Sequence, residues 1–273
     1  MIKFIALLFL LNFQWVAAQA PKSTKAKEAP LKNKSYTNGE ELHYACTFGV
    51  FPVGKAITRI DNRIFYVGGR KCYKIDCFGE TSPWISIVSK IKDQWGAFID
   101  SATVVTHVAY RKLREGNYRK DEWVTFNHKT DSAYVKVIDY EKGKYGPAQR
   151  YKTCSNVRDL VAGFMYLRAV NFDLIKKGDT LAIDGFFEDT TYKLRILFEG
   201  VEVIKCKLGK VPCYKLVPVM PANKLFDGEN SISCWISADA NQIPVKIYAK
   251  MFVGGTGVEL VKYKGLRNPV MTN

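Results

Sequence analysis

Six side chains could together form a polar site. They belong to a predicted hairpin and a predicted helix: Arg111, Glu115, Tyr118, Glu122, Asp159 and Arg168. If they converge at the mouth of a cavity, their carboxylates and guanidinium groups could support a hydrolytic reaction. The alternative is a salt-bridged rim that fixes the register of the hairpin. Both interpretations fit the residue types.

Two of these charges need partners from outside the predicted helix. Asp159 and Arg168 lie nine residues apart, or about 900° around a helix, so they face opposite sides and cannot pair with each other. Arg111 and Glu115 are the candidate partners.

The cysteines suggest one cross-strand pair. The chain has seven, an odd number, so at least one is a free or intermolecular thiol in an oxidising compartment. In the segment CKLGKVPC, a two-residue turn at Gly209 and Lys210 would place Cys206 opposite Cys213. The expected Cα spacing of about 5.5 Å permits a disulfide, and two buried free thiols fit the pattern equally well.

Motifs for common cofactors and nucleophiles are absent from the sequence. It contains no G-x-S-x-G, P-loop, H-E-x-x-H or EF-hand pattern, and its three histidines have no metal-ligand spacing. We therefore expect neither a cofactor nor a metal. The sequence identifies no catalytic residue beyond the polar set.

The N-terminus predicts export. Lys3 precedes an apolar run over 4–11, and small residues near Ala18 and Ala20 suit signal peptidase, so residues 1–20 are expected to be a signal peptide. Residues 21–35 are polar and basic and predict a flexible leader. We expect residues 36–268 to form a single β-rich domain. No later stretch is long and apolar enough to predict a membrane span, so an exported location, the periplasm above all, is expected.

The charge balance limits the classes of partner. Of 273 residues, 41 are Lys or Arg and 26 are Asp or Glu, which gives a net charge of +15. Nucleic acid is not expected, because the chain is exported and has no recognisable binding module. A positive surface favours an anionic lipid or polymer of the cell envelope. A merely soluble cationic surface is the alternative, and the sequence leaves the oligomeric state open.

Alternating apolar residues predict a mostly β fold. The clearest alternation runs over 243–253, and similar patterns occur over 42–48, 104–110 and 192–198. Further strands are expected over 53–60, 64–68, 71–78, 90–99, 117–127, 133–140, 180–187, 211–219, 231–237 and 257–263. Such a set predicts an antiparallel sheet curved into an open or half barrel.

Two helices interrupt this pattern. A short turn is expected over 83–88, where Ser82 precedes Pro83. The main helix is expected over 157–170, with Asn156 as its N-cap and an apolar stripe that packs on the concave side of the sheet. That stripe consists of Leu160, Val161, Phe164 and Leu167.

Four stretches carry a family resemblance. They are GEELxY with FGxFxVG over 39–54, YRK with EGxYRKxE over 110–122, DLV through YxR over 159–168, and WISxD with NxIPV over 235–245. With them the chain resembles a family of exported proteins from Gram-negative envelopes known only as a domain of unknown function. The resemblance implies a curved antiparallel sheet around one helix, similar in shape to the half-barrels of lipoprotein carriers. It implies no catalytic residues.

Two functions follow as hypotheses. The first is a non-enzymatic binding or structural protein of the envelope, which holds an apolar or amphipathic molecule between sheet and helix. The alternative is an envelope hydrolase with a polar cleft of Arg111, Glu115, Asp159 and Arg168. A continuous apolar lining would favour the first, and a cleft with converging carboxylates the second.

Overall fold

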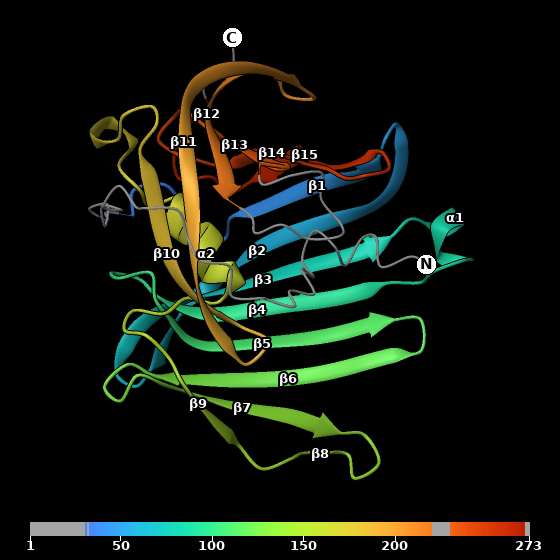
Figure 1. Cartoon of the computed structure of the whole chain (residues 1–273), viewed down its shortest axis with the longest axis vertical. Coiled ribbons are helices and arrows are strands. Elements are labelled where there is room, and N and C mark those ends of the chain that lie inside the picture. The colour runs from blue at the N-terminus through green and yellow to red at the C-terminus, as the bar shows by residue number, and fades with distance from the viewer. Residues whose placement is uncertain (1–30, 32, 220–229, 271–273) are drawn as a thin grey trace.

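The computed structural model describes residue 31, residues 33–219 and residues 230–270, and it is mostly β (Figure 1). The first half contains β1 (Glu41–Phe48), β2 (Phe51–Val67), β3 (Arg70–Thr81), α1 (Pro83–Ser86), β4 (Lys92–Asp100), β5 (Thr106–Glu115), β6 (Tyr118–Asn127), β7 (Ser132–Asp139), β8 (Lys144–Tyr145) and β9 (Gln149–Lys152). The second half contains α2 (Leu160–Leu167), a 3₁₀ turn (Phe172–Leu174), β10 (Thr180–Phe187), β11 (Thr190–Cys206), β12 (Gly209–Val219), β13 (Ile232–Ser237), β14 (Pro244–Lys250) and β15 (Gly255–Lys264). The sequence thus predicted the fold class correctly.

The strands form one antiparallel sheet that is not closed into a barrel. Its order runs from β10 through β15, then to β1 and on through β8, with β9 paired to β7. β1 therefore joins the two halves, because it pairs with β15 on one side and β2 on the other. The predicted strands at 53–60 and 64–68 are one long strand, β2, with a register shift between Ile60 and Ile64.

The main helix lies against the concave face of the sheet (Figure 1). α2 is shorter than the predicted 157–170, and its N-cap is Asp159 rather than Asn156. The reason is that the preceding residues belong to the sheet: Arg158 forms a parallel bridge to Gly185 of β10, and Asn156 has a left-handed φ of 55°. The Asp159 carboxylate accepts hydrogen bonds from the backbone N–H groups of Val161 and Ala162.

A buried ion pair fixes the other end of α2. Arg168 donates from Nη1 and Nη2 to Glu40 at 2.5 and 2.8 Å, and Nη2 also donates to the Asn241 carbonyl at 3.1 Å. Both charged side chains are 1% exposed. Burial alone would lower the pKa of Arg168, but Glu40 outweighs that effect and holds the pKa above its ordinary value. The helix is thereby tied to the residue before β1 and to the loop before β14.

The hairpin between β11 and β12 has a different register from the one predicted. Its turn is at Lys207 and Leu208, so Cys206 pairs with Gly209 and Cys213 lies opposite Glu202. The prediction of Cys206 opposite Cys213 is therefore wrong, and the seven cysteines are free thiols. In the observed register Leu208 lies in the turn and packs against the core. The prediction of a turn at Gly209 and Lys210 considered only local turn preference and did not include this packing.

The predicted signal peptide lies outside the described residues, as does most of the predicted leader. The described end of that leader contacts the domain: Leu31 forms a β-bridge to Val170, and the Ser35 hydroxyl bonds to Gln242. Contacts with the domain therefore begin before residue 36.

We expect the free energy of unfolding to depend strongly on the Glu40–Arg168 pair. Arg168→Met should lower the free energy of unfolding by about 3–5 kcal/mol, because it leaves the Glu40 carboxylate buried without its counter-charge. The double variant Glu40→Met/Arg168→Met should recover most of that loss. Urea denaturation of the three proteins measures both values. A double variant as unstable as the single one would contradict the explanation.

Glu41 should make the fold sensitive to acid. Burial would raise its pKa, but hydrogen bonds from Arg59 and His43, together with Lys264, lower it to about 2. Because the folded pKa lies below the ordinary value, the stabilisation is present above pH 4.5 and is lost as the pH falls towards 2. The stability difference between the native protein and Glu41→Gln should shrink over this interval in pH-dependent denaturation curves. A constant difference would contradict the assignment.

Candidate functional site

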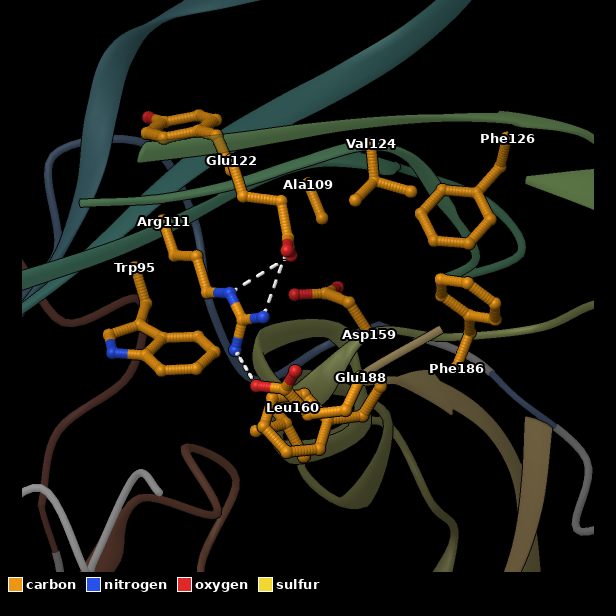
Figure 2. A pocket seen from close by; sticks show the side chains of 12 residues that line it. Trp95, Ala109, Arg111, Glu122, Val124, Phe126, Asp159, Leu160, Phe186 and Glu188 are labelled. Carbon is orange, nitrogen blue, oxygen red and sulfur yellow. Dashed lines mark hydrogen bonds and ion pairs between the residues drawn. The ribbon is translucent and has the colours of Figure 1, made fainter. Parts of the chain in front are cut away.

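Three of the predicted polar residues meet at one small cavity. Arg111 on β5 lies directly opposite Glu122 on β6 and contacts its carboxylate twice at 2.9 Å. It also donates to Glu188 at 2.5 Å. Figure 2 shows Arg111 between these two carboxylates, with Asp159 pointing into the same space. Arg111 and Glu122 were predicted as members of one polar set but not as a pair, and Glu188 was not included in that set.

Glu188 reaches this cluster from a strained turn. Glu188 and Asp189 link β10 to β11 and have φ values of 45° and 61°, the left-handed region. Two-residue hairpin turns of this kind favour Asn and Gly, so two acidic residues raise the conformational energy of the turn. The ion pair with Arg111 offsets that cost, and Lys120 adds a contact to Glu188 at 3.4 Å. Consecutive acidic residues between two predicted strands were the available sequence signal.

The surroundings keep the Arg111 cluster charged. The guanidinium group lies 5.2 Å from the ring centres of both Trp95 and Phe187. Burial by itself lowers the pKa of Arg111, but Glu188 and Glu122 outweigh it and raise the pKa above its ordinary value. Burial by itself raises the pKa of Glu188, but the hydrogen bond and the positive charge of Arg111 outweigh burial and lower this pKa below its ordinary value.

The cavity beside Arg111 has room for little more than water. Its volume is about 30 Å³. On its far side Phe126 of β6 and Phe186 of β10 meet edge to face, with ring centres 5.6 Å apart (Figure 2). The charged and aromatic contacts together hold the β10–β11 hairpin over β5 and β6. We call these contacts of Arg111 with Glu122 and Glu188, and of Phe126 with Phe186, the clasp, because they join two parts of the sheet.

Asp159 is occupied by structural hydrogen bonds. Besides capping α2, it accepts a hydrogen bond from the Thr106 hydroxyl at 2.6 Å. Burial raises the pKa of Asp159 despite these bonds. The pairing of Asp159 with Arg111 or Glu115 that the sequence suggested is not the one observed.

The remaining predicted site residues lie elsewhere. Glu115 and Tyr118 pair with each other at the turn between β5 and β6, and Tyr118 is exposed. Arg168 pairs with Glu40 at the C-terminal end of α2. The described residues thus do not gather the six side chains into one cleft. They contain no cluster of three or more His, Cys, Asp or Glu side chains suited to a metal ion.

A second, larger cavity lies between α2 and the concave face of the sheet. Its volume is about 210 Å³, and its walls are almost entirely apolar. The helix contributes Leu160, Val161, Phe164 and Met165. Phe164 was predicted to be part of a buried stripe, but its side chain is 37% exposed because it faces this space.

Few polar groups line this second cavity. Arg168 and Trp95 are among its lining residues, and Trp95 also lines the smaller cavity. Each of these two residues has a buried N–H group without a hydrogen-bond partner among the described residues. The atoms are Nε of Arg168 and Nε1 of Trp95. A continuous apolar lining was the feature expected to favour a binding protein over a hydrolase, and the lining of this cavity is of that kind.

The fold and the two cavities define a class of curved, open β-sheet proteins that enclose one helix. A β-barrel-like protein of a domain of unknown function, DUF1849, from Brucella abortus has this fold, with a TM-score of 0.54 at 9% identity. The match covers 84% of this chain and 98% of that one. Residues 42–261 match the family described as protein of unknown function, DUF3108, and the chain belongs to that family. The resemblance to an uncharacterised bacterial family is confirmed.

Two further solved structures match with lower scores. A protein from Bacteroides fragilis that is described as exported and as having a YmcC-like fold aligns with a TM-score of 0.34 at 8% identity, covering 85% of this chain and 98% of that one. A protein from Parabacteroides distasonis that is described as a lipoprotein aligns with a TM-score of 0.32 at 10% identity, covering 84% of this chain and 97% of that one. No curated protein sequence matches the chain. Neither helix in the described part of the chain has the length and hydrophobicity to cross a membrane.

The clasp should contribute to stability. Glu188→Gln removes a charged hydrogen bond to Arg111 and should lower the free energy of unfolding by about 1–2 kcal/mol, since Glu188 is partly exposed. Glu199→Gln, which breaks a comparable surface pair with Lys215, is the matched control and should change stability by less than about 0.5 kcal/mol. Equal effects in thermal denaturation would show that the Arg111 cluster is no clasp.

Proposed function

We propose that this protein is an exported, non-enzymatic carrier that holds an apolar chain of an envelope lipid between α2 and the sheet. The observation that carries the proposal is the apolar cavity of about 210 Å³. The predicted signal peptide supports the exported location, and the positive charge of the chain suits anionic envelope molecules.

The size and lining of the cavity support an acyl chain as its occupant. The cavity exceeds the engineered apolar cavity of about 150 Å³ that binds benzene. Sheet residues such as Leu42, Ile247 and Val258 face the helix across it. Phe164 is well exposed for an aromatic side chain on the inner face, which is the state expected of a residue that contacts a ligand.

The polar groups of the cavity favour uncharged acceptor oxygens on the part of the ligand that lies beside Arg168 and Trp95. Glu40 already neutralises Arg168, so a second carboxylate beside this guanidinium group would meet little net positive charge. The unpaired N–H groups of Arg168 and Trp95 call instead for neutral acceptor oxygens. An acyl ester or amide fits these requirements better than a free fatty acid.

The hydrolase alternative has less support. It needs Arg111, Glu115, Asp159 and Arg168 in one cleft, whereas Arg111 and Arg168 line different cavities and each holds a carboxylate partner. The space beside Arg111 is also too small for a substrate. No observation in the described part of the chain favours this second function.

We expect protein purified from its native compartment to release an acyl lipid on solvent extraction, and native mass spectrometry to show the matching adduct. Ala249→Leu should fill part of the cavity, reduce the adduct, and weaken binding of the apolar probe N-phenyl-1-naphthylamine by roughly tenfold, or about 1.4 kcal/mol. Val203→Leu, on an exposed strand position, is the control and should bind the probe normally.

The same assay separates a ligand cavity from an incompletely packed core. Phe164→Ala should lower probe affinity while costing less than about 1.5 kcal/mol of stability, because Phe164 has few core contacts to lose. Phe172→Ala is the matched control, since Phe172 stacks on Tyr214 in the core with ring centres 4.3 Å apart and should cost about 3–5 kcal/mol. A large loss for Phe164→Ala without any change in probe binding would refute the carrier function.

A further inference from the structure

One end of the sheet carries seven large apolar side chains that are exposed to solvent. They come from the turn between β1 and β2, from α1 with the loop after it, and from the turn between β14 and β15. We call them the apolar tip: Val50, Phe51, Trp84, Ile87, Val88, Phe252 and Val253. Ile87 is 86% exposed and Trp84 is 49% exposed. Apolar side chains gathered in this way mark an interaction surface.

The segments of the apolar tip are held next to one another by hydrogen bonds. The Trp84 indole donates to the Pro52 carbonyl at 3.0 Å, which ties α1 to β2. The Gly49 N–H donates to the Gly255 carbonyl at 2.8 Å, which ties the β1–β2 turn to the start of β15. In Figure 1 these turns and α1 lie together at one end of the strands. The tip is therefore one surface.

Cations outnumber carboxylates around the apolar tip. Two carboxylates flank it: Glu80, which is paired with Lys55, and Glu115, which forms a β-bridge to Ile91. The β5–β6 turn borders the tip, since the Gly116 N–H donates to the Lys90 carbonyl at 2.8 Å. The segments 48–54, 82–91, 116–120 and 250–255 contain no Asp or Glu. They contain four cations, of which Lys120 is already paired with Glu122 and Glu188: Lys90, Arg119, Lys120 and Lys250. The tip is therefore apolar at its centre and basic at its edge.

We propose that the apolar tip docks on the surface of an anionic lipid bilayer. Aromatic and aliphatic side chains on turns can enter the headgroup region while the strands remain outside, and nearby cations are attracted to anionic headgroups. A second copy of the chain would bring the same cations together, and their repulsion opposes self-association through this surface. Charge complementarity thus selects the lipid surface.

The apolar tip lies close to one end of the large cavity. Ala249 of β14 and Thr256 of β15 are paired, both line the cavity, and they flank the turn that carries Phe252 and Val253. Docking would place this end of the cavity near the bilayer. The docking surface is independent of the proposed ligand, because its residues do not line the cavity.

Sedimentation with lipid vesicles tests the proposal. The exported form of the protein, after cleavage of the predicted signal peptide, should bind vesicles of phosphatidylglycerol and phosphatidylethanolamine, and bind phosphatidylcholine vesicles much less. Added salt should weaken the binding. Ile87→Ser/Val88→Ser should weaken it by roughly tenfold or more, because two inserted side chains are lost.

A matched variant controls for the loss of exposed apolar surface in general. Val201→Ser/Val203→Ser removes two similarly exposed valines of β11 that lie outside the tip and should bind vesicles like the native protein. Equal binding by both double variants, or no binding of the native protein to anionic vesicles, would overturn the proposal. So would native protein that is dimeric and becomes monomeric in the Ile87→Ser/Val88→Ser variant without any vesicle binding. Ala249→Leu should still bind vesicles, so failure of the carrier function would be seen separately.

Discussion

The buried ion pair between Arg168 and Glu40 is the interaction on which the rest of the structure depends. A fully buried charge is strongly destabilising without its counter-charge, so α2 must keep Arg168 against Glu40. The guanidinium group also binds the Asn241 carbonyl and lies over the Tyr36 ring. The helix end, the start of β1 and the loop before β14 are thereby held together on the concave side.

A second set of contacts decides how far the open sheet curls. The edge strand β10 receives a parallel bridge from Arg158, and the turn after it supplies Glu188 to Arg111. Phe186 meets Phe126 of β6 at the same place. These contacts draw β10 over the opposite part of the sheet without closing the hydrogen-bonded ladder. The polar residues that first suggested chemistry thus act mainly in architecture.

The apolar cavity follows from these two constraints. A helix of eight residues held at both ends by polar contacts cannot shift to fill all the space inside a sheet of this size. The space that remains is lined by the inward side chains of the strands and by Phe164. Its nearness to the apolar tip links the binding and docking proposals through the β14–β15 hairpin, although each rests on its own residues.

The amino-acid sequence by itself determined what depends on neighbours in the chain. Alternation of apolar and polar residues indicated most of the strands, because this pattern depends only on neighbouring residues. Only the tertiary structure decided that Arg168 meets Glu40, 128 residues away, and that Glu188 joins Arg111 across 77 residues. Local patterns also misplaced the N-cap and the β11–β12 turn, because sheet pairing of Arg158 and core packing of Leu208 outweighed local preference. Long-range partners are fixed by how the sheet curves, and side-chain periodicity does not encode that curvature.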